Sequence, residues 1–316
     1  MKTFSIIVPV YQNNANLQET VSRLLALRSG LADHRVELVL VDDGSSDGSR
    51  ESVAALAHEH AGAIRAVLLT RNFGQSPAIQ AGLRHASGDC IGIISCDLQE
   101  PCERFVDMVK LWEQGHKFVI GERVERLESR FHRLISSVYW RLVRRFAFPD
   151  FPRLGYDFCV IDRQVVSELN AINEKNTSIF VLIYWLGYRG HRIPIVRETR
   201  RRGRSQWKLS RKIGFTLDTL IGFTYVPARI ISGLGFGVAL LATAYLGFVL
   251  VRWAVLRAAP PGWMTVVGLV TVLGALNLFA IGVLSEYLLR ILDESRKRPP
   301  YIVDRVIIPG SPSDKP

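Results

Sequence analysis

The chain has 316 residues, of which 48% are hydrophobic and 22% are charged, so its length leaves room for about two domains of roughly 100–200 residues. Its 25 glycines, 14 prolines and 4 cysteines exclude collagen-like, intrinsically disordered and disulfide-scaffold proteins. The net charge of +11 is uneven, because residues 1–122 hold 11 Lys and Arg against 15 Asp and Glu, whereas residues 123–316 hold 29 against 14.

The N-terminus is typical of a strand that enters a loop and not of a signal peptide. The apolar run from Phe4 to Val10 stops at Tyr11, which leaves too few residues for a hydrophobic signal region and a cleavage site. We therefore expect the N-terminal domain to stay in the cytoplasm, where thiols remain reduced. The four cysteines form no C-x-x-C pair and are expected to be small buried side chains: Cys90, Cys96, Cys102 and Cys159.

Residues 1–123 alternate between short apolar segments and helical patterns. The strand candidates are rich in Val and Ile and apolar on both faces, which is typical of strands buried in a parallel sheet. They are Phe4–Tyr11, Val36–Asp43, Ile64–Thr70, Cys90–Asp97 and Lys117–Gly121. The helices predicted between them are Asn16–Leu27, Asp47–Glu59, Pro77–Ala86 and Pro101–Trp112. Such repeated strand–helix units predict a doubly wound α/β domain whose ligands bind at the carboxyl ends of the strands.

Residues 124–212 mix apolar helical patterns with a strongly basic stretch. Helices are expected at Glu128–Arg145 and at Arg163–Ala171, the second of which is capped by Asp162. Ser178–Leu186 is apolar and is expected to pack against the sheet. From Arg197 to Lys212 there are eight basic residues and one acid.

From Leu209 to Ile221, apolar residues recur at helical spacing beside the basic stretch. This pattern favours a basic amphipathic helix on a membrane surface, with an ordinary packing helix of the soluble domain as the alternative. An anionic membrane surface or lipid also accounts for the basic half of the chain better than nucleic acid does, because the same half contains long apolar runs.

Two charge-free runs follow, Ile230–Val251 and Ala258–Ser285. The first has 22 residues and reaches about 33 Å at ~1.5 Å per residue, enough to cross about 30 Å of hydrocarbon. Basic flanks and a connecting Pro-Pro-Gly turn predict a transmembrane hairpin with both ends in the cytoplasm, the alternative being two buried core helices. The predicted organisation is an α/β domain over 1–196, a basic loop and amphipathic helix over 197–228, two transmembrane helices over 229–290 and a cytoplasmic tail over 291–316.

Acidic and small polar residues gather where three predicted strands end. The first strand ends at Tyr11, the second ends in the segment over 42–49 and the fourth ends in the segment over 95–99, so we expect these residues to line one crevice. Carboxylates there can accept hydrogen bonds from a base and a ribose, and Asp97 can supply the hard oxygen that a divalent cation on a diphosphate requires. No Walker loop or G-x-G-x-x-G fingerprint occurs, and Asp-Asp-Gly-Ser taken alone is also compatible with a helix-capping turn.

With these motifs the chain resembles glycosyltransferase family 2, whose members have the GT-A fold. The motifs are Pro9-Val10-Tyr11, Asp42-Asp43-Gly44-Ser45-Ser46-Asp47, Arg71-Asn72-Phe73-Gly74, Asp97-Leu98-Gln99 with Pro101, and Gly121-Glu122-Arg123. The hairpin and the Arg-Gly-x-Ser-x-Trp stretch narrow the resemblance to the polyprenyl-phosphate glycosyltransferases, which include bactoprenol glucosyltransferases, the aminoarabinose transferase and dolichyl-phosphate mannosyltransferases. The resemblance covers residues 4–290.

The resemblance implies a role for each matching residue. The residues implied for the nucleotide sugar are Pro9, Tyr11, Asp42 and Asp43 around the base and ribose, and Arg202, Ser205 and Lys208 on a loop over the diphosphate. Those implied for Mg²⁺ or Mn²⁺ are Asp97 and Gln99. Those implied for the lipid phosphate are Arg123, Arg133 and Ser137, the last two in the family's R-x-x-x-S spacing. Asp157 would lie near the reacting centre, so that Asp157 and Asp97 are the candidate catalytic residues.

Two positions depart from the family pattern. Ser95 stands where the family has the first acid of a D-x-D motif, which removes one charge from the metal site. Gln12 and Asn13 stand where many relatives have Asn-Glu. Metal affinity is therefore the property of this chain that the resemblance leaves open.

The implied reaction is an inverting, single-displacement transfer of one sugar from a nucleotide sugar, UDP-linked in most bacterial relatives, to undecaprenyl or another polyprenyl phosphate. Because that phosphate is already anionic, the protein needs to position it and neutralise its charge, which arginine does bidentately. The implied protein is a multi-pass homo-oligomer, a tetramer by the resemblance, of the bacterial inner membrane. The alternatives are a processive polysaccharide synthase and a non-catalytic, membrane-tethered nucleotide-sugar-binding protein. The sequence identifies neither the sugar nor the base.

Overall fold

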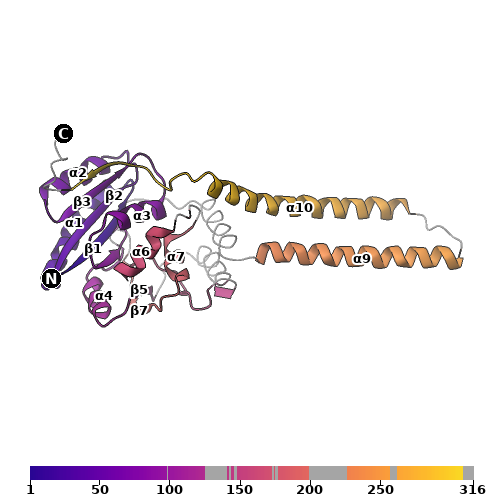
Figure 1. Ribbon diagram of the computed structural model, residues 1–316, viewed down its shortest axis with the longest axis horizontal. Coiled ribbons are helices and arrows are strands. Elements are labelled where there is room, and N and C mark those ends of the chain that lie inside the picture. The colour runs from indigo at the N-terminus through magenta and orange to yellow at the C-terminus, as the bar shows by residue number, and fades with distance from the viewer. Residues whose placement is uncertain are drawn as a thin grey trace. The chain divides into compact units, whose positions relative to one another are not determined.

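The computed structural model describes residues 1–97, 99–124, 141, 144–145, 148–172, 174, 177–198, 226–256 and 262–308. The chain forms two compact units, of which the first comprises Met1–Thr216 with Pro299–Pro316 and the second Leu217–Arg298. The first unit is an α/β domain, and the described residues of the second form two long helices (Figure 1).

The first unit is built on an eight-stranded mixed sheet with the order β7-β5-β6-β4-β1-β2-β3-β8. The strands are β1 (Lys2–Val10), β2 (His34–Asp42), β3 (Ile64–Leu69), β4 (Cys90–Ile93), β5 (Phe118–Arg123), β6 (Cys159–Asp162), β7 (His191–Ile195) and β8 (Val303–Ile307). Neighbours β3, β2, β1 and β4 are parallel to one another, and β5 is parallel to β7. Strands β6 and β8 run antiparallel to their neighbours.

Helices cover both faces of the sheet, as a doubly wound domain requires. Their bounds are α1 (Asn14–Ala26), α2 (Ser49–Glu59), α3 (Gln75–His85), α4 (Arg104–Glu113), α6 (Arg163–Ala171) and α7 (Ile179–Trp185), with a short 3₁₀ turn η1 (Leu27–Ser29) after α1. Alternate residues of β1, such as Phe4 and Ile6, share one core with apolar residues of α1, α2 and α4. The opposite face carries α3, and a Cβ on Gly82 of that helix would lie 2.6 Å from the side chain of Ile7. All four cysteines are buried and unpaired, as expected.

The predicted strands and helices of residues 1–123 are confirmed, with shifted ends. The fourth strand is shorter than predicted because it ends at Ile93, and the fifth continues to Arg123. Helix α6 has the predicted bounds, and Asp162 caps it by accepting a hydrogen bond from the backbone N–H of Gln164. All but three residues of the helix predicted at Glu128–Arg145 lie outside the described residues. The basic loop after Glu198 and the amphipathic helix predicted at Leu209–Ile221 also lie outside them.

Strands β6, β7 and β8 were not among the predicted strands. Strand β8 is the most distant in sequence, because it lies in the segment over 291–316 that the sequence indicated only as a tail. It pairs antiparallel with β3, and Ile307 is buried against the domain core. The last part of the chain that the structure describes is therefore an edge strand of the α/β sheet.

The second unit contains α9 (Val226–Leu256) and α10 (Trp263–Ser295), which lie side by side and run in opposite directions (Figure 1). Within α10, Thr265–Ser295 is long and apolar enough to cross a membrane, and α9 holds a shorter apolar segment, Ile231–Tyr245. The predicted helical pair is therefore present. Its insertion into a membrane as two spans stays a prediction.

Asp162 joins two parts of the fold, and its loss should destabilise the α/β domain. One carboxylate oxygen caps α6 and the other accepts a hydrogen bond of 2.7 Å from the buried indole N–H of Trp112. Asp162→Ala should lower the free energy of unfolding by about 1–3 kcal/mol, because the cap is lost and the indole N–H is left without its acceptor. Thermal unfolding of the detergent-purified protein would measure this. Asp107→Ala, which removes an exposed acid of α4, is the control, and an equal effect in both variants would contradict the assignment.

Candidate active site

Loops that follow β1, β2 and β4 are tied together at the carboxyl edge of the sheet. The backbone N–H of Gln12 donates to the hydroxyl of Ser45 over 3.1 Å, and that of Asn13 donates to the hydroxyl of Ser49 over 3.1 Å. The amide nitrogen of Asn13 also donates to the carbonyl of Cys96 over 2.5 Å. The two residues that depart from the family pattern after Tyr11 therefore hold the edge loops in register.

Asp43 fixes the loop that follows β3. Its two carboxylate oxygens accept hydrogen bonds from the backbone N–H groups of Phe73 (2.7 Å) and Gly74 (2.9 Å). The adjacent Gly44 has a φ of +67°, and a Cβ there would lie 2.4 Å from the carbonyl carbon of Arg71, so only glycine allows this approach. Burial raises the pKa of Asp43 to about 6, although the two N–H groups favour its ionised form.

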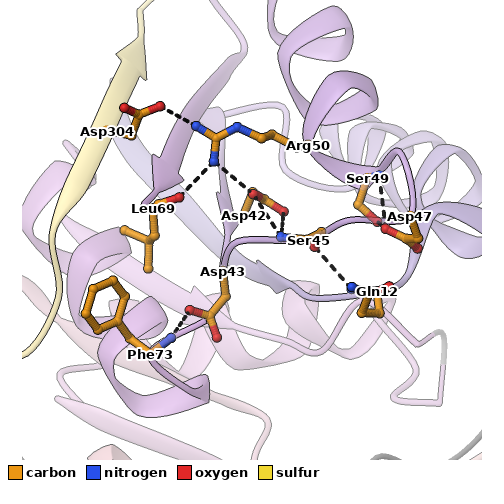
Figure 2. Close-up of polar contacts among 10 residues, drawn as sticks. All are labelled: Gln12, Asp42, Asp43, Ser45, Asp47, Ser49, Arg50, Leu69, Phe73 and Asp304. Atoms are coloured by element: carbon orange, nitrogen blue, oxygen red, sulfur yellow. Dashed lines mark hydrogen bonds and ion pairs between the residues drawn. The ribbon is translucent and has the colours of Figure 1, made fainter. Parts of the chain in front are cut away.

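Asp42 is fully buried at the end of β2, and its carboxylate points into the protein. It accepts a hydrogen bond from the backbone N–H of Ser45 at 3.2 Å and lies 3.5 Å from a guanidinium nitrogen of Arg50 (Figure 2). Asp42 and Asp43, predicted to face a nucleotide, thus both hold neighbouring backbone. Of the residues predicted for the base and ribose, Tyr11 is the most open, with 36% of its surface exposed.

A second group of charged side chains lies at the same edge because of the direction of β6. Since β6 is antiparallel to both neighbours, its first residue, Cys159, pairs with Ile93 near the end of β4 and with Ile120 in β5. Asp157, two residues before β6, therefore lies beside the end of β4. The parallel pair β5 and β7 aligns Arg123 with Ile195, and this places Arg197 at the same edge.

Two arginines and three carboxylates meet there and are called the charged cluster. It consists of Asp97, Glu100, Arg123, Asp157 and Arg197. Arg197 reaches all three acids, at 3.7 Å from Asp97, 3.1 Å from Glu100 and 3.9 Å from Asp157. Arg123 forms a close ion pair with Asp157 and lies 3.7 Å from Glu100.

The two inner acids of the charged cluster differ in their tendency to ionise. Burial, reinforced by the charge of Asp157, raises the pKa of Glu100 well above its ordinary range. Burial also opposes ionisation of Asp157, but the guanidiniums of Arg123 and Arg197 hold the pKa of that carboxyl below its usual value. Asp157 is therefore the carboxylate that stays ionised beside Arg123.

Asp97 and Gln99 fit a cation whose coordination is completed by oxygens of the bound ligand. Among the described residues, no group of three or more His, Cys, Asp or Glu side chains has the spacing of a metal site. Mg²⁺ is often held by one or two carboxylates and substrate phosphates, so one carboxylate is compatible with this mode. The amide nitrogen of Gln99 donates to the carbonyl of Glu198 at 3.3 Å, which leaves the amide oxygen as the group that can ligate.

The structure brings together only part of the predicted site. Asp97, Gln99, Arg123 and Asp157 lie at one edge, whereas five predicted residues fall outside the described part of the chain: Arg133, Ser137, Arg202, Ser205 and Lys208. Sequence reasoning missed Glu100 as a site residue and counted Arg197 only among basic residues near the membrane. The position of Glu100, three residues after Asp97 in the same loop, was the available signal.

Comparisons with known proteins agree with this fold. The model of the family described as "Glycosyl transferase family 2" matches residues 5–169. The chain belongs to glycosyl transferase family 2. It is therefore a glycosyltransferase, and the family interpretation made from its motifs is confirmed.

Relatives extend the similarity beyond the matched domain. The chain is 32% identical over 314 residues to the undecaprenyl-phosphate 4-deoxy-4-formamido-L-arabinose transferase of Klebsiella pneumoniae, covering 97% of this chain and 94% of the relative. It is 29% identical over 300 residues to the bactoprenol glucosyl transferase of Shigella phage SfV, covering 95% and 97%. Glucosyl-3-phosphoglycerate synthase of Mycobacterium tuberculosis has a similar structure, with a TM-score of 0.50 at 19% identity over 68% of this chain and 76% of that chain. The predicted GT-A fold is confirmed.

The raised pKa of Asp43 predicts a pH dependence of stability. Because the folded-state pKa of about 6 exceeds the ordinary value of about 3.8, the folded state binds the Asp43 proton more tightly than the unfolded state does. The stabilisation that this proton supplies is complete below about pH 4 and is lost as the pH rises through 6. The corresponding loss is up to about 3 kcal/mol. Asn does not titrate, so Asp43→Asn should remove this slope from melting temperatures measured between pH 4 and 7. Asp33→Asn, at an exposed acid, should keep it, and parallel profiles of wild type and Asp43→Asn would contradict the prediction.

Proposed function

We propose that this glycosyltransferase moves a single sugar from a nucleotide sugar to undecaprenyl or another polyprenyl phosphate, with inversion, at the cytoplasmic face of the bacterial inner membrane. The observation that carries the proposal is the charged cluster. In this cluster Arg197 lies within ion-pair distance of both Asp97 and Asp157, and Asp157 also pairs with Arg123. A reaction between a diphosphate donor and a phosphate acceptor needs acidic cation ligands and phosphate-binding cations next to each other. Relatives named for undecaprenyl-phosphate and bactoprenol sugar transfer support the acceptor class.

We propose that the donor binds over the loops after β1 and β2. Tyr11 offers a partly exposed ring to a base, and Pro9 shapes the strand end below it. Asp42 and Asp43, which the resemblance implies for the base and ribose, contribute by fixing these loops through their hydrogen bonds to the backbone. UDP is the first donor nucleotide to test. Arg202, Ser205 and Lys208 are proposed to close over the diphosphate.

The proposed cation, Mg²⁺ or Mn²⁺, is assigned to Asp97 and Gln99. When bound, it would neutralise charge that develops on the leaving nucleoside diphosphate. The similar mycobacterial enzyme was crystallised in complex with Mn²⁺ and UDP, which is a property of that protein. In this chain the amide oxygen of Gln99 and the carboxylate of Asp97 would supply the hard ligands.

The proposed acceptor site lies on the arginine side of the charged cluster. Arg123, together with Arg133 and Ser137, is assigned to binding the lipid phosphate. Asp157 supports this binding because it holds the Arg123 guanidinium in place. Because the acceptor phosphate is already ionised and the pKa of Asp157 is lowered, we assign Asp157 an orienting role and not that of a proton acceptor.

The membrane part of the proposal rests on α9 and α10. Both are proposed to span the bilayer as a hairpin with the α/β domain in the cytoplasm, so that the lipid phosphate reaches the domain at the membrane surface. Residues over 197–228 are proposed to lie on that surface. A homo-oligomer, by resemblance a tetramer, completes the proposal.

The function can be tested with a panel of donors. Membranes containing the protein are incubated with undecaprenyl phosphate, a divalent cation and UDP- or GDP-linked sugars, and the lipid products are identified by mass spectrometry. One lipid monophosphate sugar should form, and Asp97→Ala should reduce its rate about a hundredfold or more, because charge on the leaving diphosphate is no longer stabilised. Asp107→Ala removes an acid outside the site and should keep the rate. A polymer product, or full activity of Asp97→Ala, would overturn the proposal.

Variants of Asp157 test its assigned role. Asn keeps a hydrogen-bond acceptor for Arg123, so Asp157→Asn should lose about tenfold in rate, whereas Asp157→Ala should lose about a hundredfold because the close contact that holds the Arg123 guanidinium is removed. Rates of lipid-product formation across pH 5–9 would be compared for the three proteins. Equal inactivity of both variants, or loss of the acidic limb of the rate–pH profile in Asp157→Asn, would instead make Asp157 an essential base.

A further inference from the structure

Arg50, in the first turn of α2, contacts three separate elements of the α/β domain. One guanidinium nitrogen donates to the carbonyl of Leu69 in β3 over 2.7 Å and lies 3.5 Å from the carboxylate of Asp42. The other nitrogen forms a close ion pair with Asp304 of β8 (Figure 2). A single planar side chain therefore connects the ends of β2 and β3 with the edge strand.

Asp42 requires this partner because its carboxylate is fully buried. A buried carboxylate is costly unless a cation and hydrogen bonds compensate it. The backbone N–H of Ser45 donates a hydrogen bond to the Asp42 carboxylate. Arg50 is the cation that lies within ion-pair distance of Asp42 among the residues that the structure describes. The same N–H bond shapes the loop proposed to bind the donor, so the position of Arg50 bears directly on that loop.

An irregularity in β8 aims Asp304 at Arg50. Along the β3–β8 pair, Leu68 aligns with Arg305 but Leu69 aligns with Val303, so Asp304 is the additional residue at a register shift. Such bulges redirect side chains at sheet edges. The N–H of Thr70 donates to the carbonyl of Ile302 over 3.1 Å and fixes the strand just before the bulge. Asp304 is half-exposed, so its pair with Arg50 is a minor contribution to folding.

We propose that Arg50 and Asp304 are positioning residues of the donor site, and that β8 orders the loop after β2 through Arg50. This inference rests on the proposed function, because it concerns the nucleotide half of the same site. Strand β8 follows α9 and α10 in the chain, so the segment beyond the second unit supplies a part of the donor site that residues 1–196 lack.

The chemistry of the guanidinium makes the inference specific. Arginine can serve Asp42, Leu69 and Asp304 at once because its donors form a rigid planar fork, whereas lysine presents one ammonium group and cannot hold all three. Asp304 does not contact Asp42, so it acts only by holding Arg50. The effects of removing Asp304 and Arg50 should therefore not add.

The test uses the full-length protein in detergent and measures binding of UDP and of GDP, each with Mn²⁺, by titration calorimetry. For the nucleotide that binds the wild type, Arg50→Gln should weaken affinity about tenfold, Arg50→Lys about fivefold and Asp304→Asn about threefold, as a lost charged hydrogen bond predicts. The double variant Arg50→Gln with Asp304→Asn should match Arg50→Gln alone. Arg305→Gln changes the neighbouring exposed residue of β8 and should bind like the wild type.

Transfer assays on the same variants separate positioning from general loss of structure. The KM for the nucleotide sugar should rise with the lost affinity, while the KM for undecaprenyl phosphate stays unchanged, and Asp304→Asn should melt within a few degrees of the wild type. Wild-type affinity in Arg50→Gln and Asp304→Asn, or additive losses in the double variant, would overturn the inference while leaving the proposed function intact. If nucleotide binding responds as expected but no lipid-linked sugar forms, the proposed function fails and the inference stands. Absence of any nucleotide binding to the wild type would overturn both.

Discussion

The need to compensate buried carboxylates at the carboxyl edge of the sheet governs the arrangement of this site. Asp42, Asp43 and Glu100 have almost no exposed surface, and each would be expensive to bury as an isolated charge. Two sets of neighbouring groups compensate these carboxylates. Backbone N–H groups and Arg50 surround the acids after β2, and the arginines at the ends of β5 and β7 surround those after β4. The conformations of these loops therefore depend on these contacts as well as on the sequences of the loops.

The same compensation divides the edge into two halves with different chemistry. At the end of β2, the carboxylates of Asp42 and Asp43 accept hydrogen bonds from neighbouring backbone N–H groups, and these bonds order the surface beside Tyr11. After β4, Arg123 and Arg197 are shared among three carboxylates, so positive and negative groups alternate within a few ångströms. The first half suits recognition of a nucleotide, and the second suits two phosphate-bearing reactants whose charges must be balanced.

Strand direction explains why residues so far apart in sequence meet. An all-parallel sheet would leave the residues that precede a strand at the opposite edge from those that follow one. The antiparallel β6 reverses this for Asp157, which precedes its strand and yet lies beside the residues that follow β4 and β5. Strand β8 is likewise antiparallel, and its bulge brings Asp304 to Arg50. These two reversed strands carry side chains into a site otherwise built by parallel strands.

The sequence by itself determined the α/β class, the helical pair and the family, because buried strands, long charge-free runs and the Asp-Asp-Gly-Ser and Asp-Leu-Gln motifs are local patterns. Through the family resemblance it also implied Asp97, Gln99, Arg123 and Asp157 as site residues, and it predicted correctly that Asp162 caps α6. The tertiary structure alone decided the partners of these residues. Nothing local distinguishes Arg197 from the other arginines that follow it, because its position depends on the pairing of β5 with β7. Nothing local predicts that Asp304 lies beside Arg50 either, because that contact depends on the register shift between β3 and β8.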